Sequence, residues 1–287
     1  MQFDQIGVVG AGMMGTEIAL VVALSGADVI LTDTSADQLD RARQRIETVL
    51  DKGVTREIYT AEQANTARAR LTMGQDITAL SDRELVIEAV YEDEAVKADI
   101  LLKLEEITDD TTILASNTSS ISISVLAGYL SEPRRQRVVG MHFFSPVSRM
   151  QLVEVIPGFD TSEHTVAAAM ETCRAAGKTP IRVKDVTGFA VNRLLHIFWI
   201  EANRLVEEGV ASPEDIDTAC KLGLGHPVGP YELMDQVSNS LSLQVQEILH
   251  DAYGPRFMPR PILKQMVRSG RDGRKANRGW FDYGDGI

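Results

Sequence analysis

The chain has 287 residues, of which 44% are hydrophobic and 24% are charged, and its formal net charge is −12. This length and composition predict a globular protein of two domains, each with its own hydrophobic core. The acidic charge argues against general nucleic-acid binding, which needs a basic face to displace counterions from phosphates. The most apolar stretch, residues 18–31, is interrupted by Ser25, Gly26 and Asp28, so we expect no membrane span.

The N-terminus and the cysteines predict a cytoplasmic protein. Residues 1–5 contain no basic region followed by an apolar run, so we expect no secretory signal. Cys173 and Cys220 lie far apart and belong to no CxxC pattern. We therefore expect two free, inert thiols in a reducing compartment.

Residues 1–185 alternate short apolar runs with helical patterns. A helix is predicted over 16–25, and a long one follows residue 33, with Leu39, Ile46, Val49 and Leu50 at roughly helical spacing. The apolar runs predict strands at 5–10, 28–33, 85–90, 112–115 and 138–142. Such alternation is typical of βαβ units, so we predict an α/β domain with a Rossmann-type, doubly wound, mostly parallel sheet.

Residues 186–287 predict a second, all-helical domain, with the boundary near residues 185–188. The apolar stretch 194–200 predicts packing against another surface, and a homodimer is the simplest candidate. A strand is expected only at 280–283. Helices punctuated by Gly and Pro are expected at 191–208, 213–222, 230–252 and 261–269.

A glycine motif follows the first predicted strand and opens the first predicted helix. Gly10 permits a tight turn, Gly12 lets the backbone approach a pyrophosphate, and Gly15 lets the helix lie close to the strand. Asp33 ends the next strand about 20 residues later, which is the context of a dinucleotide site. The expected cofactor contacts of the motif are Gly10, Ala11, Gly12, Met13, Met14 and Gly15.

Asp33 predicts the choice of cofactor. A carboxylate at this position accepts hydrogen bonds from the adenosine ribose and repels a 2′-phosphate, so we expect NAD rather than NADP. The nearest basic residue downstream, Arg41, is two helical turns further on and is poorly placed to hold that phosphate.

Glu154 interrupts an aliphatic run, where a carboxylate is costly unless it is paired. If residues 138–144 and 150–156 form antiparallel strands, a turn near Ser148 places His142 opposite Glu154. A histidine held by a carboxylate is a poised general base, because the carboxylate fixes the tautomer and stabilises imidazolium. A structural His–Glu pair in a core is the alternative.

Several ordered motifs resemble the 3-hydroxyacyl-CoA dehydrogenase family, particularly its bacterial 3-hydroxybutyryl-CoA members. The resemblance covers nearly the whole chain and implies an NAD-dependent dehydrogenase of short acyl-CoA substrates. Beyond the glycine motif it rests on residues 115–120, 142–144, 152–156, 188–193, 214–217, 229–233 and 279–283.

The resemblance also implies roles for individual residues. His142 would take the proton of the 3-hydroxyl group, with Glu154 as its partner. Ser119 and Asn192 would hydrogen-bond the oxygens of the substrate. The cofactor contacts that it implies are Glu92 and Lys97 beside the nicotinamide ribose, together with Ser119, Ser145 and Lys275.

Lys52 and Arg56 are the candidates for the coenzyme A tail, because basic residues of this region contact the coenzyme in the family. A solvated surface is the alternative. A second basic cluster, more consistent with an exposed face apart from Lys275, comprises Arg268, Arg271, Arg274, Lys275 and Arg278.

The chain departs from the family pattern at three places. Ser145 stands where the family usually has Asn, residues 238–240 replace Gly-Leu-Asp, and residues 279–281 replace Gly-Phe-Tyr. The remaining histidines, His164, His196, His226 and His250, show no metal-ligand spacing, so no metal site is expected.

Two other functions remain possible from the sequence. The chain could oxidise a small 3-hydroxy acid or a carnitine-like substrate without coenzyme A. It could also be a non-catalytic NAD-binding structural or sensor protein, although a binding module has no need of the base His142.

Overall fold

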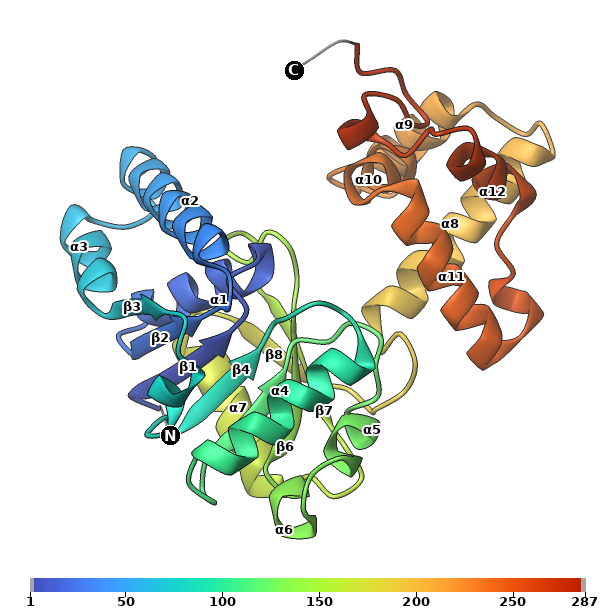
Figure 1. The fold of residues 1–287 in the computed structure, drawn as a ribbon. Helices are drawn as coiled ribbons and strands as arrows, with labels where there is room; N and C mark the ends of the chain where they lie inside the picture. The colour runs from blue at the N-terminus through green and yellow to red at the C-terminus, as the bar shows by residue number, and fades with distance from the viewer. Residues whose placement is uncertain (1–2, 285–287) are drawn as a thin grey trace. The chain divides into compact units, whose positions relative to one another are not determined.

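The computed structural model describes residues 3–284, and the chain divides into two compact units, residues 1–186 and 187–287. Figure 1 shows the first unit in blue to yellow and the second in gold to red. The first contains the β-sheet, and the second is helical.

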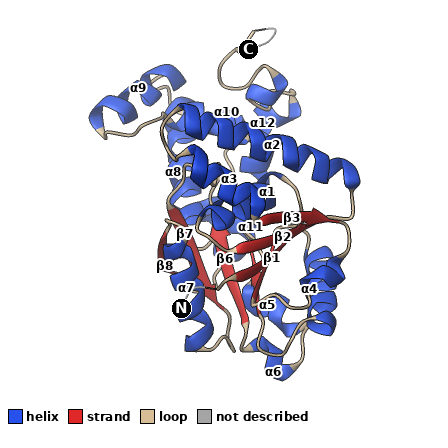
Figure 2. Cartoon of the chain, turned by 90° about the vertical axis from the view of Figure 1, so that its left-hand side faces the viewer, coloured by secondary structure: helices blue, strands red, loops and turns tan. Residues whose placement is uncertain are grey.

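The first unit contains one eight-stranded sheet in the order β3-β2-β1-β4-β5-β6-β7-β8. Neighbouring strands are parallel except β6 and β7, which pair antiparallel, so the predicted Rossmann-type fold is confirmed (Figure 2). The strands are β1 (Gln5–Val9), β2 (Asp28–Thr32), β3 (Leu71–Gly74), β4 (Leu85–Glu88), β5 (Ile113–Ser116), β6 (Val138–Phe143), β7 (Leu152–Pro157) and β8 (Thr179–Arg182).

Helices cover the sheet, and every residue of β4, β5 and β6 is buried. Burial of successive residues means that both faces of these strands are covered, as parallel sheets require. The helices of this unit are α1 (Met13–Leu24), α2 (Ala36–Thr55), α3 (Ala61–Ala69), α4 (Glu94–Ile107), α5 (Ile123–Gly128), α6 (Glu132–Arg135) and α7 (Glu163–Ala175).

The second unit contains α8 (Val191–Glu207), α9 (Pro213–Gly223), α10 (Pro230–Val237), α11 (Asn239–Tyr253) and α12 (Pro261–Arg268). The prediction of one helix over 230–252 was wrong. Ser238 has a φ of 113°, which no α-helix accommodates, and its hydroxyl accepts a hydrogen bond from the N–H of Leu241 at 3.2 Å. The chain therefore breaks at Ser238 and begins a new helix.

The prediction of a strand at 280–283 was also wrong. Within this segment only Asp282 makes a β-bridge, an isolated one with Arg278. The buried carboxylate of Asp235 accepts hydrogen bonds from the N–H groups of Trp280 and Phe281, both at 3.0 Å. A side chain thus satisfies donors that a sheet ladder would otherwise have taken.

His196 lies in the core of the helical unit. It is 4% exposed, and its ring meets that of Trp199 edge-on with centroids 5.0 Å apart. Burial removes water from the imidazolium form and lowers the pKa of His196 from 6.5 to about 4. The core around Trp199 therefore contains a histidine that is neutral at pH 7.

Acid should destabilise this unit through His196. The unfolded chain binds a proton below pH 6.5 and the folded chain only below about 4, so the free energy of unfolding rises with pH across that window. The full effect is roughly 3 kcal/mol. Both tryptophans, Trp199 and Trp280, lie in this unit, so their fluorescence during urea unfolding at pH 4.5 and 7 measures it.

His196→Leu should flatten this dependence, whereas His164→Gln, which changes an exposed histidine of the first unit, should not. A pH dependence that survives in His196→Leu would contradict the assignment.

Candidate functional site

The glycine turn lies between β1 and α1. Gly10 has a φ of 101°, and a Cβ there would lie 2.7 Å from the carbonyl oxygen of Ala89. A Cβ on Gly15 would lie 1.9 Å from the carbonyl oxygen of Gly10. A Cβ on Gly12 would meet nothing within 4 Å. The protein's own packing thus requires the outer two glycines, and Gly12 leaves open space beside the backbone.

This turn fits the pyrophosphate of NAD. Gly12 is the N-cap residue of α1 and offers no side chain to the first N–H groups of the helix, which suits them to a phosphate. Asp33 follows β2, and its two carboxylate oxygens each accept a 2.8 Å hydrogen bond, from the N–H groups of Ala11 and Ser35. The carboxylate is therefore held beside the glycine turn.

Backbone hydrogen bonds connect the segments that follow the strands. The N–H of Gly10 donates to Thr32 at 2.7 Å, and the N–H of Asn117 donates to Glu88 at 2.8 Å. The side-chain oxygen of Asn117 accepts a 2.9 Å hydrogen bond from the N–H of Phe143. Asn117 thus connects the segment after β5 to the strand that carries His142.

His142 on β6 pairs directly with Glu154 on β7, so the predicted antiparallel register is confirmed. Nδ1 of His142 lies 2.8 Å from Oε2 of Glu154. Glu154 is fully buried, and His142 is 6% exposed and packs against the ring of Phe144. The carboxylate favours a proton on Nδ1, and in that tautomer Nε2 carries the lone pair that can accept a proton.

Glu92 holds the serine-rich loop that follows β5. Its Oε1 accepts hydrogen bonds from the hydroxyl of Thr118 at 2.6 Å and from the N–H groups of Ser119 and Ser120 at 2.8 and 3.0 Å. The hydroxyl of Ser119, an expected substrate contact, also donates to Glu92 at 3.2 Å. The structure thus brings together two of the predicted residues, Glu92 and Ser119.

Glu92 remains ionised. Burial alone would raise the pKa of Glu92, but the charge of Lys97 and the hydrogen bonds from Thr118 and Ser119 outweigh burial and lower it. Lys97 is 1% exposed, and its Nζ lies 3.2 Å from Oε2 of Glu92.

Ser145 lies beside the glycine turn. Its hydroxyl is 3.7 Å from the sulfur of Met13, at a cis peptide bond with Pro146. The same loop is anchored where the N–H of Ser148 donates to the buried Glu17 at 3.3 Å and where Lys178 donates to the carbonyl of Met150 at 2.9 Å.

The remaining predicted contacts belong to other segments of the chain. Asn192 is in the first turn of α8 and Lys275 is exposed after α12, both in the second unit. Lys52 and Arg56 are exposed at the end of α2.

Sequence reasoning missed Glu88, which ends β4 and is fully buried. It carried the same signal that singled out Glu154, a lone acid that interrupts an apolar run, here residues 85–90.

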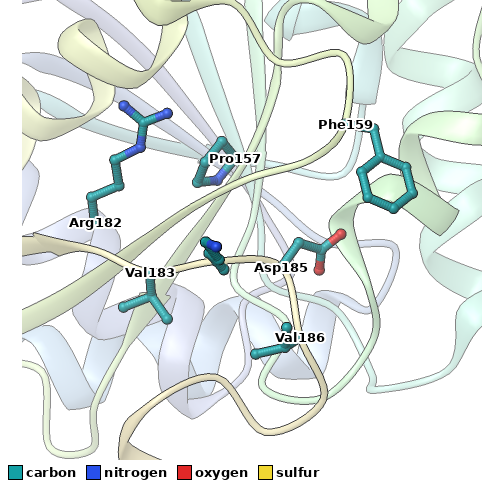
Figure 3. A pocket seen from close by; sticks show the side chains of 7 residues that line it. Pro157, Phe159, Arg182, Val183, Asp185 and Val186 are labelled. Atoms are coloured by element: carbon teal, nitrogen blue, oxygen red, sulfur yellow. The ribbon is translucent and has the colours of Figure 1, made fainter.

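One cavity of the first unit carries no acid–base pair. Its lining, shown in Figure 3, contains none of the predicted site residues. The lining residues are Pro157, Phe159, Arg182, Val183, Lys184, Asp185 and Val186. Asp185 accepts hydrogen bonds there from the hydroxyl groups of Ser122 and Ser124 at 2.7 and 2.6 Å, so its carboxylate supports the start of α5.

Other kinds of site find little support within residues 3–284. No three His, Cys, Asp or Glu side chains there cluster as metal ligands would. In the same range, no helix is both long enough and apolar enough to cross a membrane. Both cysteines are buried and free, and burial raises the pKa of the Cys173 thiol to about 12, so it is no nucleophile.

Comparison with known proteins gives matches to both units. A family model described as the NAD binding domain of 3-hydroxyacyl-CoA dehydrogenase matches residues 5–186, and the model of the C-terminal domain of the same enzyme matches residues 188–283.

Individual relatives cover almost the whole chain. The probable 3-hydroxybutyryl-CoA dehydrogenase of Deinococcus radiodurans is 41% identical over 280 residues, which are 97% of this chain and 100% of the relative. The mitochondrial hydroxyacyl-coenzyme A dehydrogenase of Sus scrofa is 37% identical, over 96% of this chain and 90% of the relative. The crystal structure of (S)-3-hydroxybutyryl-CoA dehydrogenase from Ralstonia eutropha superposes with a TM-score of 0.95 at 38% identity, covering 99% of this chain and 100% of that one.

These matches confirm the resemblance inferred from the motifs. The glycine turn, the carboxylate of Asp33 and the matching NAD-binding domain agree on the cofactor. The chain belongs to the 3-hydroxyacyl-CoA dehydrogenase family and is an NAD-dependent oxidoreductase.

Proposed function

We propose that the chain interconverts (S)-3-hydroxyacyl-CoA and 3-oxoacyl-CoA with short acyl chains, 3-hydroxybutyryl-CoA and acetoacetyl-CoA above all. The observation that carries the proposal is the buried His142–Glu154 pair. In this pair a base with a fixed tautomer lies on the same sheet as the strand that leads into the glycine turn. The names of the relatives support the acyl-CoA substrate over a free 3-hydroxy acid or a carnitine-like one, and favour an enzyme over a non-catalytic NAD-binding protein. Such a reaction belongs to β-oxidation of fatty acids and to butanoate metabolism.

His142 is the acid–base residue of this proposal. NAD, when bound, accepts the hydride from the 3-carbon during oxidation. Nε2 of His142 takes the proton of the 3-hydroxyl group, and the carboxylate of Glu154 stabilises the imidazolium that results. In the reverse direction the same nitrogen returns the proton. Ser119 and Asn192 hydrogen-bond the substrate oxygens and orient the reacting carbon.

The proposed cofactor contacts start from the glycine turn. Residues 10–15 hold the pyrophosphate, and Asp33 holds the adenosine ribose. Glu92, with Ser119 and Ser145, lies by the nicotinamide end, and Lys275 of the second unit adds a cation near the cofactor.

The role of Asp33 has a direct test. The wild type should prefer NAD over NADP by at least about tenfold in kcat/KM, because the carboxylate repels the 2′-phosphate. Asp33→Ala should weaken the use of NAD and relax the exclusion of NADP, whereas Asp37→Ala, which removes an exposed carboxylate of the same region, should change neither. Equal use of both cofactors by the wild type would contradict the assignment.

The dyad predicts a large loss of turnover. His142→Gln should lower kcat by about 10²–10⁴-fold while NADH binding stays near that of the wild type, since the imidazole acts on the substrate and not on the cofactor. Glu154→Gln should also lose much of its activity. The double variant should be far less impaired than the product of the single effects, because the two side chains act as one unit.

The pH profile separates a catalytic pair from a structural one. The pH profile of oxidation should change in Glu154→Gln, because the imidazolium that forms at His142 loses its stabilising charge. His164→Gln and Glu171→Gln serve as exposed controls. Independent, multiplicative losses, or a pH profile that Glu154→Gln leaves in place, would show that Glu154 is only a structural neighbour.

A cationic flank of α2 is our proposed site for the coenzyme A phosphates. Positions 41, 45 and 52 fall within about 40° of one another on a helix of 3.6 residues per turn, and Arg56 directly follows the last residue of α2. Arg41, Arg45 and Lys52 therefore share one exposed flank with Arg56 at its end, and of these Arg45 also lies 3.7 Å from the carboxylate of Glu17. Acidic side chains occupy the opposite flank, where Glu47 and Asp51 pair with Arg68. On a chain of net charge −12, this flank supplies the local positive field that a polyanion needs.

Loss of the positive charge on this flank should weaken the binding of acyl-CoA. Lys52→Gln/Arg56→Gln should raise the KM for acyl-CoA severalfold with a smaller effect on kcat, because these contacts are remote from the hydride. Added salt should imitate the double variant by screening the phosphates. The matched control, Arg43→Gln/Arg174→Gln, removes two exposed charges that pair with nearby acids. An unchanged KM for acyl-CoA in the double variant would show that the phosphates bind at another surface.

We further propose a homodimer formed through the helical unit in the cytoplasm. Leu194 and Ile197, 71% and 36% exposed, lie three residues apart on one face of α8, where a second copy would cover them. Free, buried cysteines suit a reducing compartment. Sedimentation equilibrium at the mass of a single chain, 31.5 kDa, would contradict the dimer.

A further inference from the structure

Two charged side chains from other elements hold the loop that connects the strands of the dyad. This loop runs from β6 to β7 over residues 144–151, so His142 and Glu154 lie close to its two ends. Glu17 of α1 and Lys178, which directly precedes β8, both hydrogen-bond its backbone. Neither takes part in the proposed acid–base step, although Glu17 is only 6% exposed.

Lys178 donates to two carbonyl groups of the loop. Its Nζ bonds the carbonyl oxygen of Val147 and, at 2.9 Å, that of Met150. Lys178 is half-buried, and burial lowers its pKa, while the nearby charge of Glu17 opposes this effect. The ammonium group thus joins the middle and the end of the loop to the segment before β8.

Glu17 accepts a hydrogen bond from the same loop. Its Oε2 bonds the N–H of Ser148 at 3.3 Å, and its Oε1 lies 3.7 Å from Nη1 of Arg45. A buried carboxylate is costly without partners, and these two contacts, with the charge of Lys178, supply them.

The loop follows the first turn of α1. Met13 and Glu17 are four residues apart in that helix, so their side chains lie on one face of it. The hydroxyl of Ser145 contacts the sulfur of Met13, and Ser148, three residues further along the loop, contacts Glu17. This turn of α1 begins after Gly12, where the first N–H groups suit the pyrophosphate of NAD. The loop is therefore held against the end of α1 that suits the cofactor.

The side chain of Ser145 depends on this arrangement because it is exposed. An exposed hydroxyl keeps one place only where the backbone that carries it is fixed. Fixing that backbone before NAD arrives removes an ordering cost from cofactor binding.

We propose that Glu17 and Lys178 are positioning residues, which hold the β6–β7 loop against α1 and thereby fix the Ser145 hydroxyl beside the glycine turn. The inference rests on the proposed function for the contact of Ser145 with the cofactor. It gives a role in NAD binding to two side chains that do not themselves touch the cofactor.

The test compares Lys178→Met, Ser145→Ala and the double variant Lys178→Met/Ser145→Ala. NADH affinity is measured by fluorescence titration, together with the thermal midpoint. Each single variant should weaken NADH binding by about fivefold, because Ser145→Ala removes one hydrogen bond and Lys178→Met removes its fixed direction. The double variant should bind NADH within about twofold of the weaker single variant, because both changes remove the same contact.

The coupling to Ser145 separates positioning from a purely structural role. If Lys178 only stabilised the fold, Lys178→Met would lower the thermal midpoint and leave NADH affinity unchanged at temperatures well below it. Unchanged affinity in Lys178→Met would overturn the proposal, and so would losses that multiply in the double variant. Wild-type affinity in Ser145→Ala would overturn it too, since the loop would then carry no cofactor contact.

Glu17→Ala is the second variant. It removes the acceptor of the Ser148 N–H, and alanine suits the helix at this position. It should weaken NADH binding about as much as Lys178→Met and show the same coupling to Ser145→Ala. If Lys178→Met does not fold, this second pair of variants decides by the same outcomes.

The matched control is Lys184→Met, which removes an exposed lysine of the same unit and should match the wild type in NADH affinity. NADH binding needs no acyl-CoA, so the test stands even if the wild type fails to turn over acyl-CoA. That failure would sink the proposed function alone.

Discussion

Strands buried on both faces leave few places for polar chemistry, and in this chain those places are the ends of the strands. Every residue of β4, β5 and β6 is buried, so a charged side chain within them must find a partner inside the protein. Parallel strands end at one edge of the sheet, which brings the glycine turn, Asp33, Glu92 and the serine-rich loop to the same side. The single antiparallel pair, β6 with β7, adds His142 and Glu154.

Two buried carboxylates show how this constraint produces function. Glu154 and Glu88 are both 0% exposed, and each has one cationic or titratable partner, His142 and Lys97 respectively. The imidazole of His142 has a ring nitrogen that can accept a proton, whereas the ammonium group of Lys97 is enclosed by three acceptors of the protein. Each buried acid thus has a basic side chain as its partner, on a neighbouring strand for Glu154 and on a helix for Glu88.

The sequence alone predicted those features that leave a periodic pattern or a spaced motif in the chain. The fold class, the glycine turn and the register of His142 with Glu154 followed from alternation and from one lone acid in an aliphatic run. The sequence analysis missed β3 and β8, which are four residues long and lie at the two edges of the sheet. Edge strands are partly exposed, so they lack the run of apolar residues that marks a buried strand, and β8 can contain Pro180 because an edge strand tolerates proline. The break at Ser238 and the burial of Lys97 depend on tertiary packing, which no local pattern records.

We propose that His142 serves as the base of hydride exchange with an acyl-CoA. The most direct measurement follows NADH oxidation by the purified chain with acetoacetyl-CoA, and then with free acetoacetate and an oxidised carnitine analogue at equal concentration. We expect rapid NADH oxidation with acetoacetyl-CoA, a product of (S) configuration, and little turnover of the free acids. Equal turnover of the free acids, or none with acetoacetyl-CoA under conditions where NADH binds, would contradict it.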